Sequence, residues 1–377
     1  NVLSPLHPAI KIITTYPHHS TKIFQLFDTN LKKNGLHFNS LLLHALVNQM
    51  SNNVIDAKAN LQKALSKVPG STKSTLNLNI ISSMSCQLIS SYYKECEDYE
   101  NNYIWLKRSY MKSGGHQNMA NAMMLNQLCL LAAQLRKYTE LLEFREHYLA
   151  ARPGFRANWT GFALALDLNN NTTAAVEKLT QFEQAAEGKI TEKEAFEDGE
   201  CILYKNDLML KLAKNDEIKL KEVLNHLDDK KELINDKLAS LERKAEVFMR
   251  LGDLASASKI YRKLIHRNPD NFKYFKMLEI TLGIKNNNVL KYRMYANLLK
   301  KYPSSEPCRF MPLTFIQDIN ELKTYLKFYL DLYWAKGALA SFQLLKPLFK
   351  NLKMSSKIQQ IAEEICLERL TSLEENI

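Results

Sequence analysis

A pattern of apolar and turn-forming residues recurs about every 34 residues along the chain, and its clearest copy covers residues 238–271. Apolar residues spaced three and four apart place one stripe on each of two helices, a Gly-Asp pair separates the helices, and a proline ends the second. The positions that carry the pattern are, in chain order, Leu241, Ala245, Phe248, Gly252, Asp253, Ala257, Tyr261, Leu264 and Pro269. The small Ala245 and Ala257 allow the two helices to approach closely. The unit is therefore a helix-turn-helix hairpin.

The same pattern fits five further stretches of the chain. Adding 34 residues to the clearest copy gives a degenerate one, in which Glu279 and Lys291 replace the small pair and the turn moves to Asn286-Asn287. The six copies lie near residues 38–71, 83–116, 122–155, 156–189, 238–271 and 272–305. This period and pattern are typical of tetratricopeptide repeats. We therefore predict an all-α fold, a tetratricopeptide-type α-α superhelix that forms a right-handed solenoid of helical hairpins.

Two stretches depart from the period, and we predict non-standard helices at 190–237 and 306–377, one of them near 339–350. Because stacked hairpins bury their apolar faces only against their neighbours, we predict a single tetratricopeptide-repeat solenoid over residues 1–377. The chain begins with Asn rather than Met, and we expect it to be part of a longer protein. No apolar run reaches the roughly 18 residues of a membrane span. Six scattered cysteines without a C-x-x-C pair indicate reduced thiols in the cytosol.

The motifs that build active sites are missing from this sequence. A phosphate-binding loop needs closely spaced glycines, and neither the dinucleotide nor the P-loop pattern occurs. The acetyl-CoA loop pattern [RQ]-x-x-G-x-[GA], the G-x-S-x-G elbow and the H-E-x-x-H zinc pattern are absent as well. We therefore predict no catalytic, cofactor-binding or metal-binding residue, and a chain that is not itself an enzyme.

Charge is distributed unevenly along the chain, whose formal net charge is +11. Between Lys259 and Lys301 there are eleven Lys and Arg residues and two acids, Asp270 and Glu279. A solvated basic face is one interpretation, and binding of a polyanion such as RNA, an inositol phosphate or an acidic partner is the other. The residues that we select as the polyanion- or ribosome-binding set are Arg262, Lys263, Arg267, Lys300, Lys301, Lys346, Lys350 and Lys353.

Several sequence blocks occur together in one known family. They are Arg152-Pro-Gly-Phe-Arg-Ala-Asn-Trp-Thr-Gly-Phe, Glu200-Cys-Ile-Leu-Tyr-Lys-Asn, Glu242-Arg-Lys-Ala, Arg267-Asn-Pro-Asp-Asn-Phe-Lys-Tyr, Tyr302-Pro, Pro307-Cys-Arg-Phe-Met-Pro-Leu-Thr-Phe and Lys346-Pro-Leu-Phe. In this order and spacing they resemble the large auxiliary subunit of the NatA N-terminal acetyltransferase, most closely its budding-yeast-like members. The resemblance covers about residues 20–375 and implies the N-terminal half of a subunit roughly twice this length.

The resemblance implies a non-catalytic scaffold that binds and shapes a separate catalytic acetyltransferase subunit and anchors it to the ribosome for co-translational N-terminal acetylation. The implied partners are that catalytic subunit, the ribosome with its rRNA near the exit tunnel and, indirectly, nascent polypeptide chains, with no membrane and no DNA. Acetyl-CoA is expected on the catalytic partner, and inositol hexakisphosphate at the interface of the complex. The implied location is the cytoplasm, on ribosomes.

Two other binding functions fit the repeat architecture. The first is the tetratricopeptide auxiliary subunit of another N-terminal acetyltransferase, NatB, which only the blocks quoted above disfavour. The second is a tetratricopeptide adaptor that binds peptide tails, which would need convergent Lys, Asn and Arg side chains on successive first helices. Those faces carry Glu242, Glu246 and Met249 in the best repeat, which argues against an adaptor of this kind.

Overall fold

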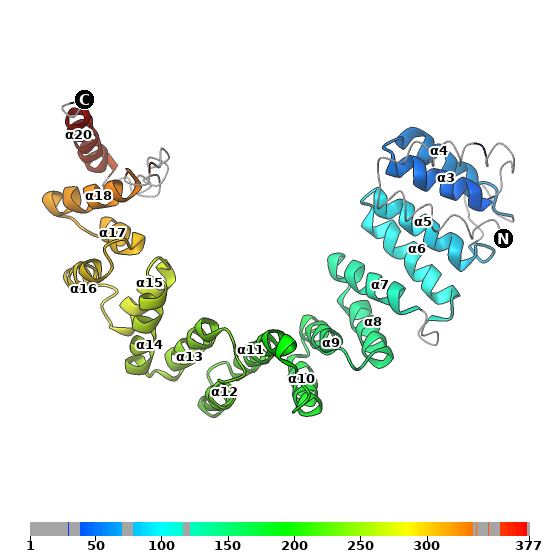
Figure 1. The fold of residues 1–377 in the computed structure, drawn as a ribbon, viewed down its shortest axis with the longest axis horizontal. Coiled ribbons are helices and arrows are strands. Elements are labelled where there is room, and N and C mark those ends of the chain that lie inside the picture. The colour runs from blue at the N-terminus through cyan, green and yellow to red at the C-terminus, as the bar shows by residue number, and fades with distance from the viewer. Residues whose placement is uncertain are drawn as a thin grey trace. The chain divides into compact units, whose positions relative to one another are not determined.

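A computed structural model describes residues 38–69, 78–115, 121–334 and 355–374, together with Thr29, Gly337 and Lys346. Every regular element within these ranges is a helix, and most helices follow one another as antiparallel hairpins (Figure 1), which confirms the prediction of an all-α fold of stacked helical hairpins. The chain divides into two compact units, residues 1–186 and 187–377, and each is described by itself. The single solenoid over 1–377 stays a prediction. In the described part of the chain, no helix has both the length and the apolar character needed to cross a membrane.

The described residues of unit 1 form four helical hairpins. Its helices are α3 (Phe38–Met50), α4 (Val54–Leu65), α5 (Ser83–Glu95), α6 (Tyr99–Lys112), α7 (Ala122–Gln134), α8 (Tyr138–Ala151), α9 (Arg156–Leu168) and α10 (Thr172–Ala186). The turn inside each hairpin has one residue in the left-handed region, and these residues are Asn52, Glu97, Arg136 and Asn170, with φ between 55° and 62°. The next backbone N–H then donates to a carbonyl five residues earlier, at 2.8 to 3.0 Å, which completes the first helix with a Schellman-type hydrogen bond.

The core of unit 1 follows the repeat pattern. Ala45 and Ala57 are fully buried and face each other across the first hairpin, and Leu41, Leu61 and Trp105 pack around them. Because an alanine occupies little volume, the two helix backbones come close enough to exclude water from the hairpin.

Of the six cysteines of the chain, Cys86, Cys129, Cys201 and Cys308 are buried, Cys96 is partly buried and Cys366 is exposed.

The described residues of unit 2 form one short 3₁₀ helix followed by α-helices of eight to twenty residues. Its elements are η4 (Glu192–Glu194), α11 (Ala195–Ala213), α12 (Glu217–Asp229), α13 (Lys237–Leu251), α14 (Leu254–Arg267), α15 (Phe272–Thr281), α16 (Asn288–Lys301), α17 (Glu306–Leu313), α18 (Ile319–Trp334) and α20 (Ser355–Glu374). The helix predicted near 339–350 lies outside the described residues.

The hairpin of α13 and α14 shows how the predicted repeat folds. Gly252 ends α13 with φ of 78°, a conformation that glycine adopts at no steric cost, and Asp253 then caps α14 by accepting a hydrogen bond from the Ser256 N–H at 2.9 Å. Ala245 and Ala257 are fully buried between the two helices. Residues 252 and 253 therefore form the turn that the sequence predicts.

The degenerate copy, α15 and α16, differs from its prediction in two ways. Its turn begins earlier than the predicted Asn286-Asn287, because α15 ends at Thr281 and Gly283 takes a φ of 67°. Glu279, which replaces a small residue, is buried and accepts a hydrogen bond from the Tyr295 hydroxyl at 2.5 Å. A charged residue is tolerated at this core position because its carboxylate has a hydrogen-bond partner.

Candidate interaction surfaces

The predicted polyanion-binding residues on α14 lie on its exposed side. The buried stripe of this helix consists of Ala257, Tyr261, Leu264 and Ile265, and packs against α13 and α15. Arg262, Lys263 and Arg267 lie outside this stripe and are exposed. The amphipathic spacing that builds the core therefore also gathers the cations on one side of the helix.

The predicted residues on α16, Lys300 and Lys301, are exposed in its last turn. The hydroxyl of Tyr302 lies 3.3 Å from His266 Nδ1, and the two rings are 6.2 Å apart between centroids. This contact joins the C-terminal ends of α14 and α16, so it places the chain segments that carry Arg267 and Lys301 next to each other. We call the surface formed by Arg262, Lys263, Arg267, Lys300 and Lys301 the basic face.

None of the five cations of the basic face takes part in an ion pair in the described part of the chain. Of the two acids in the same stretch, Glu279 is buried and Asp270 accepts a hydrogen bond from the Glu306 N–H at 3.0 Å. Cations in the last turn of a helix also interact favourably with its macrodipole, which is a structural reason for Arg267, Lys300 and Lys301. The role of these residues in polyanion binding stays a prediction.

The remaining predicted residues are not brought to the basic face by the described structure. Lys346 is exposed, and the residues next to it in the chain lie outside the described ranges. Lys350 and Lys353 lie outside the described residues.

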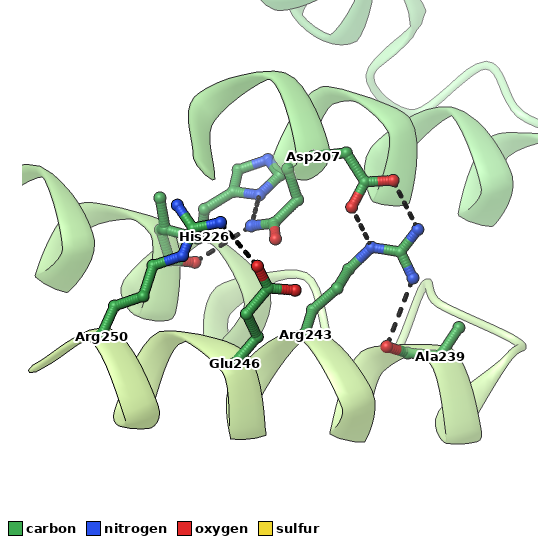
Figure 2. A network of polar contacts seen from close by, with 8 residues as sticks. Asp207, His226, Ala239, Arg243, Glu246 and Arg250 are labelled. Carbon is green, nitrogen blue, oxygen red and sulfur yellow. Dashed lines mark hydrogen bonds and ion pairs between the residues drawn. The ribbon is translucent and has the colours of Figure 1, made fainter. Parts of the chain in front are cut away.

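A second surface of unit 2 is a groove lined by side chains of α11, α13, α14 and α15, with a volume of about 440 Å³. Arg243 on α13 makes two parallel hydrogen bonds to the Asp207 carboxylate on α11, at 2.5 Å from Nε and 2.6 Å from Nη2 (Figure 2). Paired hydrogen bonds of this kind fix the guanidinium in one plane and are among the stronger charged contacts in proteins. We call this hollow the polar groove.

Two turns further along α13, Arg250 is held in a similar way. It donates to Glu246 at 2.6 Å (Figure 2). It also donates to the carbonyl oxygen of Leu210 at 3.1 Å, so it ties α13 to α11. Behind it, the fully buried Asn206 donates to the carbonyl of Val223 at 3.1 Å and lies 3.3 Å from His226 Nδ1. The polar network therefore joins α11, α12 and α13.

At the opposite side of the polar groove, the hydroxyl of Tyr274 on α15 donates a hydrogen bond to Glu242 on α13. Burial, followed by this carboxylate, raises the pKa of Tyr274 to about 12. Burial also raises the pKa of Tyr261 to about 12, and the carboxylates of Glu246 and Glu242 add to the effect. The carboxylates of Glu242 and Glu246 therefore lie close to the two phenol groups.

The sequence identified Glu242 and Glu246 on this face but missed the contacts that α13 makes with α11 and α15. The pairs Asp207–Arg243 and Glu242–Tyr274 are separated by 36 and 32 residues. These separations are close to one repeat, so the repeat period indicates which helices meet, but not which of their side chains pair. Met249, assigned to the open face, instead packs beside the core around Ala245 and Tyr261. The described residues contain no group of three or more His, Cys, Asp or Glu side chains placed to hold a metal ion.

Comparison with known proteins shows which family part of this chain resembles. Residues 196–376 match the family of the N-terminal acetyltransferase A auxiliary subunit. The N-terminal acetyltransferase A complex auxiliary subunit NAA15 of Arabidopsis thaliana is 32% identical over 254 residues, which are 65% of this chain and 28% of that protein. The human N-alpha-acetyltransferase 16, NatA auxiliary subunit, is 31% identical over 241 residues, 64% of this chain and 27% of that protein.

A solved structure of Naa15/Naa10 bound to HypK-THB contains a chain of the same fold. It matches 97% of this chain and 52% of that chain, with a TM-score of 0.68 and 25% sequence identity. The present chain therefore spans a little over a quarter of the curated relatives and about half of the solved chain.

Helical hairpins stacked on fully buried alanine pairs define the chain as a tetratricopeptide-type solenoid protein. More particularly, residues 196–376 match the family of NatA auxiliary subunits, in agreement with the resemblance seen in the sequence. Since that family consists of auxiliary subunits, the match agrees with the prediction that the chain is not an enzyme.

Proposed function

We propose that this chain is the N-terminal half of a budding-yeast-like auxiliary subunit of a NatA-type complex, which binds and shapes a separate catalytic acetyltransferase subunit. The observation that carries the proposal is the likeness of 97% of the chain to the fold of Naa15, which was solved together with Naa10. The match of residues 196–376 to the NatA auxiliary family favours this role over that of a NatB subunit or a peptide-tail adaptor. Acetyl-CoA would then be bound by the catalytic partner, and inositol hexakisphosphate at the interface between the two chains.

Co-expression with the catalytic subunit of the same organism tests the proposal. We expect the two chains to co-purify, and the pair to acetylate a peptide that begins with Ser or Ala faster than the catalytic subunit alone. The isolated chain with acetyl-CoA should show no transfer above the buffer background. Acetyl transfer by the isolated chain, or failure of the two chains to associate, would contradict the proposal.

The second part of the proposal is that the basic face anchors the complex to cytoplasmic ribosomes, near the exit tunnel. Five exposed cations without an intramolecular counter-charge support it, because each can approach a phosphate of rRNA and release a counterion. Attraction of this kind acts at long range and depends strongly on salt.

Co-sedimentation of the complex with ribosomes across a salt series tests the anchor. The slope of log K against log salt is negative when a protein binds phosphates. Its magnitude should decrease by about 4 when Glu replaces Arg262, Lys263, Arg267, Lys300 and Lys301, since each lost phosphate contact removes about 0.7 to 0.9. As a matched control, Lys58→Glu with Lys63→Glu changes two exposed lysines of α4 in unit 1 and should leave the slope nearly unchanged. An unchanged slope for the fivefold variant would mean that the basic face is only solvated.

A further inference from the structure

The polar groove has a different charge chemistry from the rest of the chain. Its arginines are already engaged, because Arg243 is bound by both oxygens of Asp207 and Arg250 by Glu246 and the Leu210 carbonyl. An arginine held by an internal carboxylate does not offer its charge to an incoming anion. Neither arginine is therefore available to the carboxylate of an acidic peptide tail.

Glu242 is placed differently. Its hydrogen-bond partner is the neutral hydroxyl of Tyr274, and it takes part in no ion pair in the described part of the chain. The rings of Tyr261 and Tyr274 belong to the same lining and are almost fully buried, at 4% and 1% exposure. The rings therefore present no open face to a ligand, and it is the carboxylate without an internal counter-charge that can form an ion pair with an ammonium or guanidinium group.

We propose that the polar groove binds a basic segment of a partner protein, with a Lys or Arg side chain of that segment against Glu242. The volume of about 440 Å³ is in the range of sites that enclose a small ligand, so it can hold a few residues of an extended chain. The chain as a whole carries a formal charge of +11 and repels a cationic segment elsewhere. Recognition must therefore come from the local carboxylates. This inference goes beyond the scaffold function, since it requires neither a catalytic subunit nor a ribosome.

Lys273 gives the proposal a second, opposite test. It lines the groove, is exposed, and takes part in no ion pair in the part of the chain that the structure describes. Its ammonium group would repel a bound cation and attract a bound anion. Removing it should therefore change affinity in opposite directions for the two kinds of ligand.

The experiment uses the whole chain and three fluorescein-labelled nine-residue Gly-Ser peptides that carry two Arg, two Gln or two Glu residues. Fluorescence anisotropy at 50 mM salt should show tighter binding of the Arg peptide than of the Gln peptide. Glu242→Gln should weaken binding of the Arg peptide about fivefold, the size of one exposed ion pair. Lys273→Ala should strengthen it about twofold to threefold.

Glu242→Gln is expected to keep the fold, because the Gln carbonyl can still accept the Tyr274 hydrogen bond, and circular dichroism checks this. Glu222→Gln on α12 is the matched control, since Glu222 is exposed and outside the groove, and it should leave all affinities unchanged. Equal affinity of the Arg peptide for the wild-type chain and a folded Glu242→Gln variant would overturn the proposal. So would binding of the Glu peptide that Lys273→Ala weakens, because the groove would then be an anion site.

Discussion

The basic face and the polar groove lie on neighbouring helices of unit 2, yet they treat charge in opposite ways. On α14 and α16 the cations are exposed and have no internal counter-charge. On α13 both Arg243 and Arg250 are neutralised by carboxylates. Unpaired charge on a surface acts at a distance and is screened by salt, whereas charge locked in bidentate contacts fixes the relative position of helices. One helical hairpin can therefore present an attracting surface and a shape-defining one.

The largest expected effect comes from the alanine pair that holds the two surfaces together. Ala257→Leu introduces three carbon atoms where Ala245 and Ala257 are fully buried, and we expect a loss of about 3 kcal/mol from such overpacking. Urea unfolding followed by circular dichroism measures the loss. Because α13 carries the groove and α14 the basic face, this variant should weaken the binding of both the Arg peptide and ribosomes.

The control for this prediction is Ala255→Leu, an exposed position of the same helix, which should change the free energy of unfolding by no more than about 0.5 kcal/mol. Equal urea midpoints for the two variants would show that the hairpin adapts to the larger side chain and that the surfaces are not coupled through it.

A smaller effect is expected from the buried acid below the basic face. Tyr295→Phe removes the hydroxyl that donates to Glu279 at 2.5 Å and leaves a buried carboxylate with one hydrogen bond fewer, at a cost of about 2 kcal/mol. Glu279→Gln keeps an acceptor for the hydroxyl and should cost less. Thermal unfolding of both variants compares them, and a more stable Tyr295→Phe chain would mean that the hydrogen bond does not compensate for burial.

These two predictions concern the part of the fold that the sequence could predict. Ala245, Ala257, Tyr261 and Leu264 were placed on the facing stripes from spacing alone, and all four are buried. Spacing succeeds here because a side chain's direction on a helix depends only on its position in the helical turn. The exposed cations of the basic face follow from the same rule.

The polar groove could not be predicted in this way. Which side chain of α13 meets α11 depends on how successive hairpins rotate and stack, and the pair Arg243–Asp207 is known only once that stacking is known. Gly283 is a similar case, since the earlier end of α15 shifts the turn away from Asn286-Asn287. Local propensity does not determine a helix end that neighbouring repeats can move.

The Arg243–Asp207 pair sharpens the comparison at the level of about 1 kcal/mol. A double-mutant cycle with Arg243→Ala and Asp207→Ala should give a coupling near this value, because the contact is bidentate and the arginine side chain is only 21% exposed. The pair Lys221–Glu217, with side chains 62% and 71% exposed, should give a smaller coupling. Chemical denaturation in urea at 0.05 and 1 M NaCl measures both cycles. If salt removes both couplings equally, the groove pair is an ordinary surface contact.

The smallest effect separates a cation that belongs to the basic stretch from one that belongs to the basic face. Lys291 lies between the two groups of predicted residues in the sequence, but its Nζ is 4.2 Å from the centroid of the Phe315 ring. Lys291→Gln should therefore lower the free energy of unfolding by about 0.5 kcal/mol through loss of a cation–π contact. It should leave the salt dependence of ribosome binding unchanged. Lys300→Gln should instead weaken this salt dependence and leave the free energy of unfolding unchanged. If both variants reduce the magnitude of the salt slope equally, the whole stretch of eleven cations acts as one diffuse charge. The cation–π contact of Lys291 would then have no consequence for ribosome binding.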